Sequence, residues 1–131
     1  MSKPTHPVEL LACAIATQEG FFHPASIPAN HHNPGDLRFA GQLNAQRPEG
    51  VPTGSPIAVF LTEGMGVAAL YRQLWLQVAQ GQSVRQIIAQ WAPPTENNTS
   101  LYLQDVLEWT GLPADTPLLN ILPALVDLTK A

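Results

Sequence analysis

Prolines and glycines divide this chain into short segments, and this division limits its fold more than any other feature. The 131 residues include 13 prolines and 9 glycines, and both residue types interrupt regular helices and strands. Between residues 21 and 56 they recur every few positions, so no long helix fits there. The segments before and after this stretch carry apolar residues at helical spacing. The sequence therefore predicts a mainly α fold with a short irregular insertion.

The first helix is expected from Pro7 to Gln18 or Glu19, because proline suits a first helical turn and Gly20 is a C-terminal stop. One face of this helix carries apolar residues and ends in Glu19. The other faces are also apolar, which is typical of a central buried helix. We expect Cys13 to serve there as a small apolar residue. The residues assigned to the Glu19 face are Val8, Leu11, Ala12 and Ile15.

Three further helices and an apolar end segment follow the insertion. Thr62 caps a helix that ends at Gly81, and Ser83 with Gln86 forms a capping box for the next helix, which stops at Pro93-Pro94. A fourth helix runs from about 99 to 110, and the segment 116–129 is helical in character with a break at Pro123. The residues predicted to be buried are Val67, Leu70, Tyr71, Leu74, Trp75 and Val78 in the helix after Thr62, Val84, Ile87, Ile88 and Trp91 in the helix after Ser83, and Tyr102, Val106 and Trp109 in the fourth helix.

The insertion itself predicts a small β-hairpin or loop-rich lobe after the first core helix. Residues 37–39 form one short strand, Gly41 a turn, and residues 57–61 a second strand. The fold class is thus mainly α (α+β). The length is that of a single domain covering residues 1–131.

Composition and charge limit the classes of partner that this chain could bind. Charged residues make up 12% of the chain, the net charge is −4, and the six lysines and arginines are scattered, so we expect no nucleic acid partner. No apolar run approaches ~18 residues, so we expect no membrane span. Residues 10–13 resemble a lipoprotein cleavage box, but Pro4, His6, Pro7 and Glu9 precede them, which argues against a signal peptide. We expect a monomer that another factor delivers if it acts outside the cell.

Glu19 is the leading candidate for chemistry. A carboxylate that continues a core-facing stripe is costly to bury, and burial with the negative end of a helix dipole favours its neutral form. A carboxylic acid that stays protonated near neutral pH is suited to act as a general acid. The alternative is a helix-end carboxylate turned to water or bonded to a local amide.

Two other segments carry polar and aromatic side chains. Asn33-Pro34-Gly35-Asp36 is explained by a tight turn, but Arg38 and Phe39 leave that turn together as a cation and an aromatic ring. Residues 91–102 place amide and carboxyl side chains between Trp91 and Tyr102, a pattern suited to sugars as well as to a helix stop and a new cap.

Metal binding by the histidines, and a catalytic role for Glu63 as a second carboxylate, both have simpler alternatives. His31 and His32 are adjacent with His23 nearby, but the chain has no HExxH motif and no cysteine pair, so a solvated loop explains them better and we expect no metal and no cofactor. Glu63 stands at a helix start, where its carboxylate complements the helix dipole.

Taken together, these segments resemble the lysozyme-like superfamily, in particular small phage-associated and bacterial domains similar to lytic transglycosylases. The motifs are a helix ending in Glu-Gly-Phe, the loop Asn-Pro-Gly-Asp-Leu-Arg, a Gly-rich helix start, and Trp-Ala-Pro-Pro-Thr-Glu-Asn-Asn-Thr followed by Tyr102. The resemblance covers about residues 8–112.

The resemblance implies a lysozyme-like fold in which Glu19 protonates the glycosidic oxygen of peptidoglycan. In the transglycosylase branch the acetamido group of the substrate assists, the sugar 6-hydroxyl closes an anhydro product, and the same glutamate then acts as base. By analogy Tyr102 and Asn97 line the opposite wall of the cleft. Asp36, Arg38 and Phe39 complete the expected substrate-binding set.

The chain departs from the pattern at two positions. Lytic transglycosylases usually carry serine after the glutamate, where this chain has Gly20, and their loop commonly reads Asn-Asn-Pro-Gly-Asn, where this chain has His32 to Asp36. Asp36 is therefore also a candidate second carboxylate, which a hydrolase needs at roughly 5–10 Å from the acid.

The leading hypothesis is a peptidoglycan-cleaving glycosidase, a lytic transglycosylase acting on the MurNAc-GlcNAc bond of cell-wall glycan strands. Since many such enzymes are basic, a chain of net charge −4 needs tethering or delivery in a bacteriophage particle, by a holin or by a secretion system. The alternatives are a non-catalytic glycan-binding or structural module of the same fold in a phage or cell-envelope assembly, and a mainly α protein interaction domain.

Overall fold

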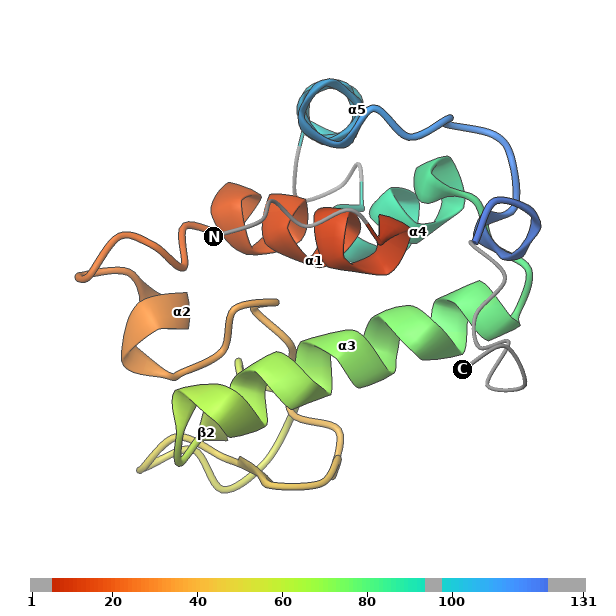
Figure 1. The fold of residues 1–131 in the computed structure, drawn as a ribbon. Coiled ribbons are helices and arrows are strands. Elements are labelled where there is room, and N and C mark those ends of the chain that lie inside the picture. The colour runs from red at the N-terminus through yellow and green to blue at the C-terminus, as the bar shows by residue number, and fades with distance from the viewer. Residues whose placement is uncertain (1–5, 94–97, 123–131) are drawn as a thin grey trace, which may run out of the picture. The chain divides into compact units, whose positions relative to one another are not determined.

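The computed structural model describes residues 6–93 and 98–122, which form a mainly helical protein with a small antiparallel sheet (Figure 1). The residues fall into two compact units, one made of residues 12–74 and the other of residues 6–11 with the described residues from 75 onward. In chain order the described elements are α1 (Pro7–Gln18), α2 (Ile27–Asn30), β1 (Ala45–Gln46), β2 (Val59–Phe60), α3 (Glu63–Ala79), α4 (Val84–Trp91), α5 (Thr99–Thr110) and the 3-10 helix η1 (Leu118–Asn120).

Helix α1 is apolar on most of its surface, as the sequence predicts. The face expected to be buried is buried, at Val8, Leu11, Ala12 and Ile15. The expectation for Cys13 is wrong, because this residue is exposed. It lies on a narrow exposed stripe with Glu9 and Thr17, four residues apart along the helix, so one face of α1 meets solvent.

The insertion forms a lobe with less sheet than the sequence predicts. Residues 45–46 pair with residues 59–60 in antiparallel register, Ala45 opposite Phe60 and Gln46 opposite Val59. The expected strand at 37–39 is reduced to one bridge, Arg38 opposite Ile57, flanked by bonds from Phe39 N–H to Pro56 O (2.7 Å) and Ala58 N–H to Leu37 O (2.8 Å). Pro56, directly before Ile57, limits the ladder, because proline donates no backbone hydrogen bond.

Helix α3 begins where its cap was predicted. The Thr62 Oγ1 accepts a hydrogen bond from Met65 N–H at 3.2 Å. Leu70, Leu74 and Val78 are buried along one face, whereas Trp75 is exposed. Glu63 is an exposed residue of the first turn, where its charge complements the helix dipole.

The first turns of α3 approach the end of α2 closely. A Cβ atom added at Gly66 would lie 1.7 Å from the carbonyl oxygen of His32 and 3.1 Å from the Pro34 ring. Only glycine permits this approach of two backbones. Figure 1 shows the same region, with the loops of the lobe beside the N-terminal half of α3.

The second unit is built on α4 and α5, which contact each other. The predicted capping box is present, with Ser83 N–H donating to Gln86 Oε1 at 2.9 Å and Gln86 N–H donating to Ser83 Oγ at 3.3 Å. Helix α5 has the predicted bounds and ends at Gly111, whose φ of 68° terminates it in the left-handed region. The core of this unit contains Val84, Ile87, Ile88, Ala92, Tyr102, Leu103, Val106 and Leu118.

Two expectations for this unit need correction. Trp109 was assigned to the buried face of α5 but is 48% exposed. The segment after Thr116 forms only the short η1 within the described residues, because Leu118 N–H bonds to Gln82 O at 3.1 Å and Pro117 bridges Ser83. The predicted break at Pro123 lies outside the described residues. In the part of the chain that the structure describes, no helix combines the length and the apolar character needed to span a bilayer.

The two glycines of the first turns of α3 give a matched test of the backbone approach. Gly66→Ala should lower the free energy of unfolding by about 3 kcal/mol or more, because the new Cβ overlaps a backbone oxygen. Gly64→Ala is the control: its added Cβ meets only Thr62 Oγ1 at 3.9 Å, so it should stabilise the protein by about 0.5–1 kcal/mol. Urea denaturation measures both, and equal effects of the two substitutions would contradict the close packing.

Candidate functional site

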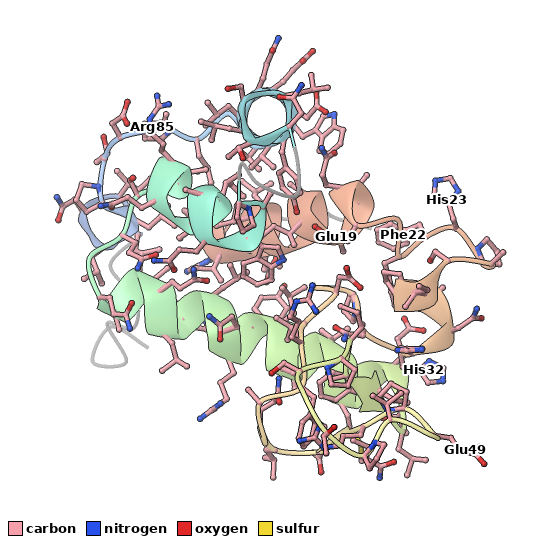
Figure 2. All side chains as sticks on the ribbon, turned by 180° about the vertical axis from the view of Figure 1, so that it is seen from behind. Glu19, Phe22, His23, His32, Glu49 and Arg85 are labelled. Atoms are coloured by element: carbon pink, nitrogen blue, oxygen red, sulfur yellow. The ribbon has the colours of Figure 1, made fainter. Side chains whose placement is uncertain are left out.

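The end of α1 fixes the backbone of Glu19. Gly20 N–H bonds to Thr17 O at 3.1 Å and Phe21 N–H bonds to Ala16 O at 3.0 Å, the two bonds of a Schellman motif. Gly20 supplies the left-handed residue of this motif, with φ of 80°. Glu19 is therefore the last residue before the chain turns, and its side chain stands at the C-terminal rim of the helix (Figure 2).

The loop after Glu19 is held by Ser26. Its Oγ donates to Gly20 O at 2.7 Å and accepts from Ala29 N–H at 3.1 Å, which also caps α2. Within this loop the rings of Phe21 and Phe22 meet edge to face, with centroids 5.4 Å apart. Phe22 is 66% exposed, so an aromatic face is open to solvent three residues after Glu19.

Asn33 is the structural centre of the second motif. Its side chain is fully buried. Its Nδ2 donates to Leu37 O and to Ala58 O, both at 2.9 Å, and its Oδ1 accepts from Leu37 N–H at 2.9 Å. The turn predicted at 33–36 is present, with Asp36 N–H bonded to Asn33 O at 3.0 Å. One amide thus closes the turn and attaches it to the chain 25 residues later.

Asp36 is brought to Glu19 by this turn. Its φ of 50° lies in the left-handed region, which aspartate tolerates better than most residues. A side-chain hydrogen bond joins Asp36 and Glu19. Burial raises the pKa of the Asp36 carboxyl, while the hydrogen bond from Glu19 and the charges of Arg38 and His31 oppose that rise.

These effects bear on the proton that Glu19 and Asp36 hold between them. Two carboxyl groups form a hydrogen bond only when one of them holds a proton. The hydrogen bond from Glu19 lowers the pKa of Asp36, so it favours the ionised form of Asp36. Burial is the larger effect and raises the pKa of Asp36 all the same, so the pair holds one proton between its two acids.

This geometry bears on the role expected of Asp36 as a second carboxylate. The carboxyls of glycosidases that use a pair are separated by roughly 5–10 Å. Asp36 in this position can orient the Glu19 carboxyl, and its role as a second carboxylate stays a prediction.

The other residues expected in this loop have clear contacts. The Arg38 guanidinium donates from Nη1 to Ser55 O at 3.1 Å, and its positive charge favours the ionised form of Asp36. Phe39 lies under the guanidinium of Arg47, 4.4 Å from its ring centroid, and Arg47 also bonds to Gly54 O. Phe39 therefore serves the packing of the lobe through a cation–π contact.

Tyr102 lies on α5 in the other unit, and its side chain is 5% exposed. Asn97 lies outside the described residues. Their expected roles stay predictions.

His31 is a member of the site that the sequence did not suggest. Its charge acts on Asp36, and its Nδ1 is buried without a hydrogen-bond partner among the described residues. The backbone of His31 is fixed by bonds from its N–H to Ile27 O at 2.8 Å and from Phe60 N–H to its carbonyl at 2.9 Å. The sequence predicts a solvated loop for His31 and His32, and the place of His31 two residues before Asn33 is the one signal that its ring could be buried instead.

Within the described residues, histidine, cysteine, aspartate and glutamate side chains form no group of three that could hold a metal ion. Comparisons with known proteins add no further constraint, since no protein-family model, no curated protein and no solved structure matches this chain.

Removal of the Asn33 amide tests its structural role. Asn33→Ala leaves the buried carbonyls of Leu37 and Ala58 without these donors, and should lower the free energy of unfolding by at least about 2 kcal/mol. Asn30→Ala, at an exposed position of α2, is the control and should change it by less than about 0.5 kcal/mol. A loss for Asn33→Ala no larger than that of the control, in urea denaturation, would contradict the role.

The raised pKa of Asp36 predicts a pH-dependent stability. A carboxyl that binds its proton more tightly in the folded state stabilises the fold at low pH, and this contribution is lost as pH rises through the folded pKa. Asp36→Asn, which also tolerates the left-handed backbone, should therefore gain stability relative to wild type as pH rises from about 4 to 7. Unfolding free energies across that range measure it, with Glu49→Gln as the control for loss of one exposed charge. A relative gain that shrinks with pH would contradict the assignment.

Proposed function

We propose that this protein is a peptidoglycan-cleaving glycosidase of lysozyme-like fold, and that it acts as a lytic transglycosylase with Glu19 as its acid and base. The observation that carries the proposal is the side-chain hydrogen bond between Glu19 and Asp36, which places two acids that share one proton at the end of α1. The resemblance of the Glu19, Asn33 to Arg38 and Trp91 to Tyr102 segments to this superfamily supplies the substrate class.

The first half of the reaction uses the proton that Glu19 holds. Glu19 transfers it to the glycosidic oxygen as the bond to the muramoyl carbon breaks, and the substrate acetamido group assists at that carbon. The leaving sugar departs with the proton. Asp36 keeps the Glu19 carboxyl oriented before the transfer, and a well-placed general acid contributes about 10²–10⁴-fold to rate.

The second half needs a base at the same position. After proton transfer two carboxylates stand side by side, and their repulsion raises the tendency of Glu19 to regain a proton. The Arg38 and His31 charges moderate that repulsion at Asp36. Glu19 takes the proton of the sugar 6-hydroxyl as its oxygen attacks the muramoyl carbon, which closes the anhydro ring and restores the acid.

The resemblance favours the transglycosylase branch, in which no second carboxylate is needed. The exposed ring of Phe22 is a candidate surface for a sugar face beside Glu19. The same ring also favours the second candidate function, a non-catalytic glycan-binding module, for which Phe22 would be a contact and Glu19 a structural acid.

Product analysis tests the enzyme directly. Wild-type protein incubated with purified peptidoglycan should release anhydro-muropeptides identifiable by mass, and Glu19→Gln should reduce release by at least about 100-fold because the amide has no acidic proton. Glu63→Gln, which replaces the other candidate glutamate at an exposed helix start, is the control and should retain activity.

The possible products separate the candidate functions. Reducing ends in place of anhydro ends would assign the protein as a hydrolase. Binding of peptidoglycan without release of any fragment by wild type would identify the non-catalytic module and overturn the proposed activity.

A further inference from the structure

A pocket of about 360 Å³ opens within the unit of residues 12–74, between one face of α3 and the loop of residues 37–44. The α3 residues that line it occur at i, i+3, i+4, i+7 and i+8, so they form one helix face. This volume lies at the lower end of the range for small-molecule sites, roughly 300–1,000 Å³. The α3 wall consists of Met65, Ala68, Ala69, Arg72 and Gln73.

The loop wall is held in shape by its own hydrogen bonds. Gln42 accepts from Ala40 N–H at 2.7 Å and donates to Arg38 O at 3.0 Å. The backbone of Leu37, which also lines the pocket, is held at both its N–H and its carbonyl by Asn33. The pocket is therefore preformed, and its wall begins at the residue directly after Asp36.

Among the described residues, Arg72 is the only charged one that lines the pocket, and none of them lines it with an acidic side chain. The other three arginines of the described residues have partners: Arg38 at Ser55 O, Arg47 at the Phe39 ring, and Arg85 at Asp115. Arg72 has no hydrogen bond or ion pair to any residue that the structure describes. In a chain of net charge −4, an unpaired guanidinium in an acid-free pocket is a distinctive feature.

The remaining lining groups define the ligand further. The side-chain amides of Asn44 and Gln73 also make no hydrogen bond within residues 6–93 and 98–122. Leu37, Leu43 and Met65 supply apolar surface. An arginine fork binds a carboxylate through two parallel hydrogen bonds, and the amides can pair with peptide groups. The complementary ligand is a carboxylate on a short arm that has both apolar and amide portions.

We propose that this pocket binds a carboxylate-bearing branch of peptidoglycan, with Arg72 as the carboxylate contact. The inference rests on the proposed function for its choice of polymer. Two parts of the muramoyl substituent carry this chemistry, the acidic stem peptide and the lactyl carboxylate that is free where the peptide has been removed. Leu37 lines the pocket and directly follows Asp36 in the chain. The branch would therefore be held near Asp36 and the proposed general acid Glu19.

A titration of the whole protein followed by NMR tests the site without any turnover. The probes are N-acetyl-L-alanyl-D-glutamate for the stem peptide, N-acetylmuramic acid for the lactyl carboxylate, and two neutral compounds, the diamide of the acetylated dipeptide and N-acetylglucosamine. We expect an acidic probe to shift signals of Leu43, Met65 and Gln73. The probe that binds more tightly identifies which carboxylate the pocket takes.

Arg72→Gln should weaken that binding at least about tenfold, the loss expected when a charge-assisted hydrogen bond is removed. Arg85→Gln is the matched control with the same charge change, and it should bind as wild type does, since Arg85 is paired with Asp115 in the other unit. Equal binding of the acidic and neutral probes, no effect of Arg72→Gln, or no binding up to about 10 mM would overturn the inference.

The two proposals fail separately. Release of anhydro-muropeptides by a protein whose Arg72→Gln variant binds and cleaves as wild type would keep the proposed function and reject the pocket. Arg72-dependent binding of an acidic probe by a protein that releases no fragments would keep the carboxylate site and reject the activity.

Discussion

The buried amide of Asn33 is the interaction on which the candidate site depends. It bonds to both backbone groups of Leu37 and to the carbonyl of Ala58, so it fixes a turn and the strand-like segment opposite in one step. An amide has donors and an acceptor on one side chain, which is what this position requires, since neither a carboxylate nor an aliphatic chain could satisfy all three groups. The turn holds Asp36 in a left-handed conformation and directs it to Glu19. The same turn holds Leu37 at the edge of the 360 Å³ pocket.

The electrostatics of the site come from few charges. With only 12% charged residues, the chain has little capacity to screen one acid from another. A side-chain hydrogen bond joins Glu19 and Asp36, and the charges of Arg38 and His31 lower the pKa of Asp36. The hydrogen bond of Arg38 to Ser55 keeps its guanidinium in the lobe that also holds the turn. Burial on one side and the Glu19 contact with the neighbouring positive charges on the other thus act in opposite directions on the pKa of Asp36.

Local signals in the sequence predicted the helices well. Caps at Thr62 and Ser83 and stops at Gly20 and Gly111 act within one turn of the chain, so their effect can be read directly from residue order. Burial of single residues was less predictable: Cys13 and Trp109 carry apolar side chains at plausible helical positions but are exposed, because tertiary packing decides which stripe faces the core.

Within the candidate site, the sequence identified Glu19 and Asp36 separately. It could not predict that they meet, because the meeting depends on the 25-residue closure between Asn33 and Ala58. It also gave no reason to choose Arg72 from among the arginines, since the choice depends on which of them lack partners in the fold. Distances across a loop are set by such long-range contacts. The sequence shows which residues are present but not which of them meet in the fold.

The exposed tip of the lobe is a place where the chain could tolerate an insertion. Residues 49–55 are exposed, and Figure 2 shows Glu49 at the outer edge of the lobe. The base of the same loop is held by the Asn33 amide and by the pairing of β1 with β2. Closure entropy grows only with the logarithm of loop length, so doubling such a loop costs about 0.6 kcal/mol. The tip is thus the position where an inserted peptide or fused tag could be carried without disturbing the turn that sets Asp36.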